Sequence, residues 1–264
     1  MGVHIENSTR PDIHNPNGYF EPVEMIGMNA WIVKELMGFT IPEPINWHTS
    51  KKVIRLNQQA FSLISRHEAF DNWAIKQPAL CLTLPFWKKF LPKDCYYIIC
   101  VRNPFAIAKS TFERDGISIS KGSAIWFVYL SHALRSTLNE KRILVYYEDY
   151  FEDYVAQINR ITNFLQLHPP SQNIVETSLN HNMTTLRELM KCDEITDKVK
   201  LLYLCLLRAK QDSGFLDHIT ETLASENIRM SSPLIKPFLY IARASGIHPS
   251  RLSPLASSQS KSNF

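Results

Sequence analysis

The distribution of apolar residues along the chain predicts an α/β fold. Residues 96–101 form a short, continuous run of β-branched and aromatic side chains, which is typical of a buried strand. The run ends at Arg102-Asn103-Pro104, and a helical pattern begins at once with Phe105. A similar run follows at residues 142–147, and a shorter one precedes at residues 73–77. We therefore predict three strands.

Helical periodicity fills the segments between these strands. The turn-rich residues 1–22 predict a loop. Apolar residues spaced three and four apart then predict helices at residues 23–36, 51–66, 79–91, 105–114, 118–138 and 154–167. Strands joined by helices of this length pair in parallel with right-handed crossovers. The prediction is an α/β fold with a parallel sheet flanked by helices, in which strand 73–77 lies beside strand 96–101.

The pattern changes beyond Pro169-Pro170, where no convincing strand follows. Helical segments are predicted at residues 196–210, 214–224 and 234–244, and a Ser-rich stretch without periodicity ends the chain. We therefore predict an α/β domain over residues 1–170, a mostly helical C-terminal extension over residues 171–250, and a disordered tail over residues 251–264.

Composition and charge narrow the class of protein. The chain has 264 residues, an apolar fraction of 45% and a net charge of +4, and its basic residues are scattered. A nucleic-acid partner is therefore not indicated. No run approaches the ~20 apolar residues of a membrane span, and the N-terminus lacks the features of a signal peptide. We expect a cytoplasmic protein without a membrane span.

Arg102 is the strongest candidate for chemistry, because it follows a strand at the edge where open α/β sheets bind ligands. Ser110 lies eight residues later on the predicted helix, so a guanidinium and a hydroxyl could hold one phosphate. The alternative is an ion pair between Arg102 and Asp94 or Glu113, with Ser110 exposed on the helix. Spacing alone leaves both interpretations open.

Two further cations could serve the same anion. Lys76 ends the neighbouring predicted strand and would lie on the same sheet edge, although most lysines in such positions are simply solvated. Arg114 is one turn past Ser110, where it could reach the anion or interact with the C-terminal end of its helix.

Glu21 is the best candidate for a general base, because it is a carboxylate in the aromatic setting of Gly18-Tyr-Phe-Glu21. The alternative is an acid that complements the dipole of the helix that follows. Glu24, His14 and His4 are weaker candidates of the same kind. No metal motif and no Ser-His-Asp or Cys-His set has a recognisable spacing.

Several of these residues belong to a series of motifs that occur in order along residues 11–170. The motifs are Asn15-Pro-Asn-Gly-Tyr-Phe-Glu21, Trp73-Ala-Ile-Lys-Gln-Pro78, Leu84-Pro-Phe-Trp87, Val101-Arg-Asn-Pro104 with Ser110, Lys121-Gly122 with Trp126, and Tyr147-Glu-Asp149. This combination resembles bacterial-type sulfotransferases, which have a P-loop-kinase-like fold. The resemblance implies transfer of a sulfuryl group from phosphoadenosyl phosphosulfate (PAPS) to a hydroxyl or amine of a small-molecule or carbohydrate acceptor, without a metal.

The resemblance also implies roles for single residues. Arg102 and Ser110 match the pair that binds the ribose phosphate of the nucleotide, and Lys76 matches the lysine that opens the family's Lys-Asp-Pro-Arg segment. The aspartate and arginine of that segment are replaced here by Gln77 and Ala79. Because Pro78 stands where related enzymes carry a catalytic histidine, Glu21 takes the role of base beside Lys76 in the catalytic site.

The front of the sequence departs from the family. Sulfotransferases begin with a strand and a glycine-containing loop that cradles the phosphosulfate, and none of the eight glycines of this chain lies in such a loop. We expect the fold to lack that first strand. Two functions follow. The first is a sulfotransferase, either truncated here and completed by an upstream segment or using a substitute anion site; the second is a catalytically inactive sulfotransferase-like module that binds a nucleotide or a protein. A nucleoside or sugar kinase would share the fold but needs a Walker-type loop, which the sequence equally lacks.

Overall fold

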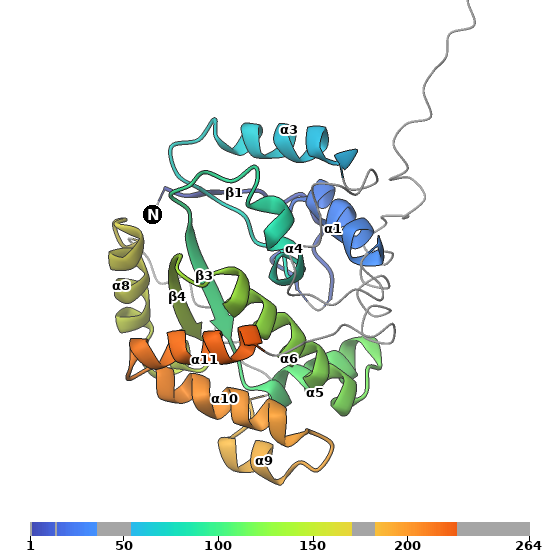
Figure 1. The fold of residues 1–264 in the computed structure, drawn as a ribbon, viewed down its shortest axis with the longest axis vertical. Coiled ribbons are helices and arrows are strands. Elements are labelled where there is room, and N and C mark those ends of the chain that lie inside the picture. The colour runs from blue at the N-terminus through green and yellow to red at the C-terminus, as the bar shows by residue number, and fades with distance from the viewer. Residues whose placement is uncertain (1, 14, 36–53, 171–182, 226–264) are drawn as a thin grey trace, which may run out of the picture. The chain divides into compact units, whose positions relative to one another are not determined.

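The computed structural model describes residues 2–13, 15–35, 54–170 and 183–225 (Figure 1). The described residues from 4 to 90 form one compact unit, here the N-terminal unit, and those from 91 to 225 form a second, the C-terminal unit. Within the described residues, each unit contains a two-stranded parallel sheet and several helices. The protein is thus an α/β protein with small parallel sheets and mostly helical content.

The sheet of the N-terminal unit joins β1 (His4–Ile5) to β2 (Trp73–Ala74). The strands are parallel, with His4 opposite Trp73 and Ile5 opposite Ala74. The prediction of a loop throughout residues 1–22 is therefore wrong at β1. A strand of two residues has no alternation that could reveal it, and its pairing depends on a partner far along the chain.

Three helices complete the N-terminal unit: α1 (Val23–Glu35), α3 (Asn57–His67) and α4 (Leu80–Trp87). They confirm three of the predicted helices, although residues 51–53 of the second prediction lie outside the described part of the chain. Helix α1 packs against both α3 and α4. Met25 and Ile32 of α1 and Phe86 and Trp87 of α4 are fully buried, so this helix pair forms the core of the unit.

The sheet of the C-terminal unit joins β3 (Tyr96–Val101) to β4 (Lys141–Tyr146) in parallel, which confirms both predicted strands. In the described residues β2 pairs with β1, so the predicted pairing of β2 with β3 is not observed. The prediction that this strand is buried holds for only part of β3. Ile99 and Val101 are buried, but Ile98 on the opposite face is 44% exposed.

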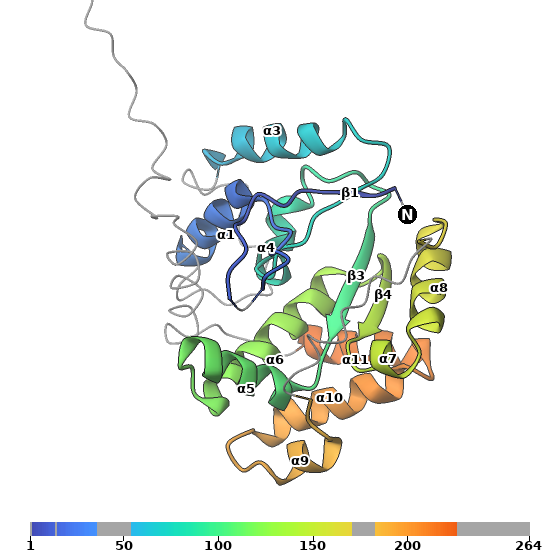
Figure 2. The same cartoon turned by 180° about the vertical axis from the view of Figure 1, so that it is seen from behind.

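The crossover from β3 to β4 runs through α5 (Pro104–Asp115) and α6 (Ile119–Ser136). These helices pack closely because Gly122 of α6 has no side chain: a Cβ there would lie 2.8 Å from Thr111 Oγ1 and 3.0 Å from Ala108 Cα. After β4 the chain forms the short α7 (Asp149–Glu152) and then α8 (Tyr154–Leu165), which packs against β4 (Figures 1 and 2). The elements around the sheet are thus helices of the crossovers, as predicted.

The remaining helices are α9 (Leu186–Lys191), α10 (Asp197–Ala209) and α11 (Ser213–Ser225). Helices α10 and α11 pack on each other and on α6, so they share the compact unit of β3 and β4. The domain boundary predicted at residue 170 stays a prediction. The predicted helix at residues 234–244 and the predicted disordered tail lie outside the described residues.

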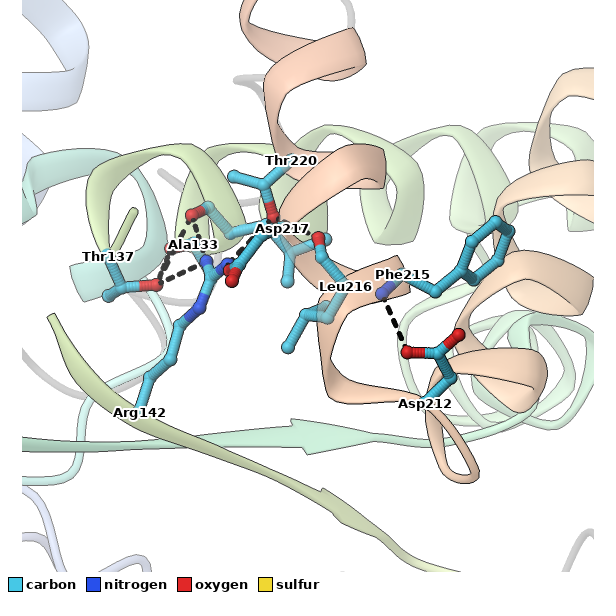
Figure 3. Close-up of polar contacts among 9 residues, drawn as sticks. Ala133, Thr137, Arg142, Asp212, Phe215, Leu216, Asp217 and Thr220 are labelled. Carbon is cyan, nitrogen blue, oxygen red and sulfur yellow. Dashed lines mark hydrogen bonds and ion pairs between the residues drawn. The ribbon is translucent and has the colours of Figure 1, made fainter. Parts of the chain in front are cut away.

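A buried arginine connects α11 to the sheet (Figure 3). Arg142 of β4 has a side chain only 5% exposed, and it donates to Leu134 O at the end of α6 at 2.7 Å. It also contacts Asp217 Oδ1 at 2.7 Å and Thr220 Oγ1 at 3.0 Å, both on α11. One side chain therefore links β4, α6 and α11.

No helix in the described part of the chain has the length and apolar character needed to cross a membrane.

Candidate functional site

Glu21 and Lys76 are in direct contact in the N-terminal unit. Lys76 Nζ lies 2.6 Å from Glu21 Oε1 and 2.7 Å from the carbonyl oxygen of Tyr19, although 55 residues separate the lysine from the glutamate. Glu21 immediately precedes the turn into α1, and Lys76 follows β2. The Glu21 side chain is only 10% exposed, whereas that of Lys76 is 51% exposed. The two residues predicted to be catalytic thus form a partly buried ion pair.

The segment after β1 holds the loop that carries Glu21. Asn7 Oδ1 accepts a hydrogen bond from Phe20 N at 2.9 Å, and Ser8 Oγ accepts one from Val23 N at 2.9 Å. The Ser8 hydroxyl also lies 3.2 Å from the carbonyl oxygen of Glu21. Sequence analysis missed Asn7 and Ser8, because residues 1–22 carry no periodic signal.

A buried polar network lies next to Lys76 along the chain. Gln77 Oε1 accepts from Asn29 Nδ2 at 2.8 Å, and Asn29 Oδ1 accepts from Thr83 Oγ1 at 2.8 Å and from Trp87 Nε1 at 2.7 Å. Asn29, Thr83 and Trp87 are fully buried. Gln77 therefore belongs to a neutral hydrogen-bond network that connects the Lys76 segment to α1 and α4.

Arg102 lies at the carboxyl end of β3 in the C-terminal unit. Its guanidinium carbon is 4.1 Å from the ring centre of Tyr147, which directly follows β4, so the two groups are in cation–π contact. The carbonyl oxygen of Arg102 accepts from Trp126 Nε1 at 3.0 Å. The negative face of an aromatic ring stabilises a guanidinium that lies over it, so Tyr147 helps to hold the Arg102 cation at this strand end.

Asn103 fixes the turn that follows Arg102. Its side chain accepts from Phe105 N at 2.9 Å as the N-cap of α5, and its backbone N–H donates to Glu148 Oε1 at 2.8 Å. Its Nδ2 donates to the carbonyl oxygen of Thr184 at 3.2 Å, which brings the segment before α9 to this turn. The Asn103–Thr184 contact spans 81 residues and has no local sequence signal.

Aromatic packing surrounds the same turn. Tyr203 of α10 makes an edge-to-face contact with Trp126, with ring centres 6.1 Å apart. Burial first, and then the carboxylates of Glu148 and Asp149, raise the pKa of Tyr203, so its phenol remains neutral at physiological pH. The turn therefore combines the Arg102 cation, the Glu148 carboxylate and neutral aromatic rings.

The structure places the other predicted residues as follows. Ser110 is partly buried on α5, two turns from the cap at Asn103. Arg114 is exposed and contacts the carboxylate of the adjacent Asp115 through two nitrogens, at 2.7 and 3.0 Å. Its role in anion binding, like that of Ser110, stays a prediction. Asp94, one alternative partner for Arg102, lies 3.4 Å from Lys141 Nζ.

The weaker candidates for a base occupy other positions. Glu24 is exposed and pairs with Arg66 at 2.6 Å, and the His4 ring stacks on Phe70 with centres 3.6 Å apart. His14 lies outside the described residues. Among the residues that the structure describes, no three His, Cys, Asp or Glu side chains gather in a metal-binding arrangement.

Comparisons with protein-family models, with curated proteins and with solved structures find no match to this chain. The candidate sites therefore rest on their own geometry: an ion pair of Glu21 and Lys76 in the N-terminal unit, and Arg102 against Tyr147 in the C-terminal unit.

Proposed function

We propose that this protein is a PAPS-dependent sulfotransferase with a P-loop-kinase-like fold, acting on a hydroxyl or amine of a small-molecule or carbohydrate acceptor. The observation that carries the proposal is the contact between Glu21 and Lys76 at 2.6 Å. The resemblance to sulfotransferases implied that both residues belong to one catalytic site, and this prediction used the sequence alone. Their contact across 55 residues is what a shared catalytic role requires.

The pair is suited to the chemistry of sulfuryl transfer. The acceptor oxygen or nitrogen forms a bond to sulfur, and the bond from sulfur to the 5′-phosphate oxygen of PAPS breaks. Glu21 takes the proton of the acceptor, and the adenosine 3′,5′-bisphosphate leaves with the bonding electron pair. Lys76 stabilises negative charge that develops on the oxygens of the transferring group, which is the usual role of a lysine at such a centre.

The proposed nucleotide contacts belong to the C-terminal unit. Arg102 and Ser110 bind the 3′-phosphate of the nucleotide, and Arg114 is a further candidate for it. Support for Arg102 comes from its position at the end of a parallel strand and from the Tyr147 ring, which lies 4.1 Å from its guanidinium carbon and helps to hold the cation there.

Isothermal calorimetry with adenosine 3′,5′-bisphosphate tests the nucleotide site. A charge-assisted hydrogen bond contributes about 1.5 to 3 kcal/mol, so Arg102→Ala should weaken binding about ten- to a hundredfold. Arg208→Ala is the matched control, because it removes the same charge from an exposed position on α10 of the same unit. Unchanged binding by Arg102→Ala, or no binding by the natural chain, overturns the nucleotide site.

Transfer of radiolabelled sulfate from PAPS to mixed hydroxyl and amine acceptors tests catalysis. Glu21→Gln keeps the shape of the side chain but cannot take a proton, so it should abolish most turnover. Turnover that survives Glu21→Gln means that Glu21 is not the base.

A second candidate is a catalytically inactive module that binds a nucleotide or a protein. One observation favours it: the ammonium of Lys76 already neutralises Glu21 and also donates to Tyr19 O, so the carboxylate is engaged before any acceptor arrives. Nucleotide binding that depends on Arg102, without sulfate transfer, supports this candidate over the enzyme.

A further inference from the structure

We propose that Asn7 is a positioning residue that holds Glu21 and Lys76 in contact. The Lys76 ammonium has two acceptors, the Tyr19 carbonyl at 2.7 Å and the Glu21 carboxylate at 2.6 Å. These two acceptors belong to the residues on either side of Phe20. The ammonium can contact both only if the backbone at Phe20 turns the preceding carbonyl and the following side chain to the same side.

Phe20 adopts the unusual conformation that this turn requires. Its φ is +53°, in the left-handed region that L-residues with bulky side chains rarely occupy. A strained residue of this kind persists where the surrounding contacts hold it in place, and such residues occur often at functional sites. A contact that opposes relaxation of Phe20 therefore also maintains the ion pair.

Asn7 supplies this contact. Its Oδ1 accepts from the backbone N–H of Phe20 at 2.9 Å. Its side chain also lies directly against Gly18, where a Cβ would be 2.8 Å from Asn7 Nδ2 and 3.0 Å from Asn7 Oδ1. Gly18 has a φ of +86°, so both its conformation and its lack of a side chain allow Asn7 to approach. Asn7 thus contacts both residue 18 and residue 20 of the loop.

The β1–β2 pairing explains why Asn7 is in the right place. Because the two strands are parallel, their carboxyl ends lie at the same edge of the sheet. Asn7 and Ser8 continue from β1 at this edge, and Lys76 continues from β2. The loop that ends at Glu21 therefore makes hydrogen bonds with both extensions: it donates to Asn7 Oδ1 and accepts from Ser8 Oγ and Lys76 Nζ. Ser8 Oγ also accepts from Val23 N at the start of α1.

Chemical labelling of Lys76 tests the proposal without relying on catalysis. Trace acetylation with acetic anhydride, measured by peptide mass spectrometry, gives the ratio of labelling at Lys76 to that at Lys141. Lys141 is the internal reference, because its side chain is 53% exposed and that of Lys76 is 51% exposed. Loss of a hydrogen bond that contributes about 1 kcal/mol should raise the ratio about fivefold in Asn7→Ala.

The conservative variant is Asn7→Asp, which keeps an oxygen acceptor for Phe20 N and should leave the ratio within about twofold of the natural chain. An unchanged ratio in Asn7→Ala, or an equal rise in both variants, overturns the positioning role.

A parallel rise at Lys89 would indicate that Asn7→Ala loosens the whole N-terminal unit. In that case Asn7→Ala is repeated in a Phe20→Gly background, because glycine adopts the left-handed conformation without needing the hydrogen bond from Asn7. A smaller rise in that background supports the role, and an equal rise overturns it.

The catalytic meaning of this pair rests on the proposed function, and the two can fail separately. If sulfate transfer occurs and the pair is positioned by Asn7, Asn7→Ala lowers kcat more than it raises KM, and Asn7→Asp restores kcat. If the labelling ratio responds as expected but no sulfate is transferred, the positioning role stands and the proposed function fails.

Discussion

Arg142→Met should release α11 from the C-terminal unit. The substitution keeps most of the apolar stem and removes a guanidinium that is 5% exposed on its side chain. The lost contacts are those to Leu134 O, Thr220 Oγ1 and Asp217 Oδ1, at 2.7, 3.0 and 2.7 Å, and a longer one to Thr137 Oγ1 at 3.4 Å. Leu134 O also accepts from Thr137 N at 3.3 Å, so it is not left without a donor.

The magnitude follows from these contacts. Each hydrogen bond from a charged donor contributes about 1.5 to 3 kcal/mol, and relief of the cost of burying a charge offsets part of the sum. The net expected loss is about 2 to 4 kcal/mol. Asp217→Asn should cost only about 0.5 to 1 kcal/mol, because the Asp217 side chain is 62% exposed and solvent screens its charge.

Hydrogen exchange in peptides covering residues 213–225 measures this change locally. A loss of about 2 to 4 kcal/mol accelerates exchange through opening of α11 about 30- to 1,000-fold. Lys141→Met is the matched control: it removes the neighbouring positive charge, which is exposed and lies 3.4 Å from the exposed Asp94, and it should change exchange little.

Two results would refute the reasoning. Equal exchange in Arg142→Met and Lys141→Met would mean that the buried guanidinium does not anchor α11. Equal acceleration in Arg142→Met and Asp217→Asn would mean that the ion pair, and not the contacts with Leu134 and Thr220, provides the anchor.

Two further predictions concern α6. Gly122→Ala should destabilise the C-terminal unit by about 1 to 3 kcal/mol, measured by urea unfolding, because the new Cβ would meet the α5 backbone. Gly214→Ala is the control and should be neutral or stabilising, because its Cβ would meet no atom closer than 3.5 Å. Burial first, and then Arg135, lower the pKa of His132 to about 4. Between pH 6.5 and about 4, His132 is protonated in the unfolded chain but neutral in the folded chain. The free energy of unfolding should therefore fall as the pH drops through this range, by up to about 3 kcal/mol. His132→Leu should remove this dependence and His218→Gln, at an exposed position, should keep it; an unchanged slope in His132→Leu contradicts the assignment.

Elements with a continuous local signal were predictable. The strand at residues 96–101 has the predicted bounds, because six adjacent apolar and β-branched residues leave little alternative. The turn at Asn103-Pro104 could also be predicted, since proline in the first helical turn fixes the start of α5. The exposure of Ile98 could not, because it depends on what covers each face of the sheet.

The candidate sites depend on contacts that no local pattern contains. Resemblance selected Glu21 and Lys76, but only the fold brings them within 2.6 Å. The Arg102–Tyr147 contact follows from the register of β3 and β4, in which Val101 pairs with Tyr146 so that both strands end level. Asn7 was missed because its role follows from a two-residue strand and a left-handed residue, neither of which has a sequence signature here.

The pairing of β1 with β2 also has a consequence for synthesis of the chain. Residues 4 and 73 are partners, so β1 has no strand to pair with until roughly 70 more residues have been translated. At ~5–20 residues per second this interval lasts on the order of 3 to 14 seconds. During this interval Lys76 has not yet reached the loop that contains Phe20. The backbone N–H and C=O groups of His4 and Ile5 can then form hydrogen bonds with other segments or chains.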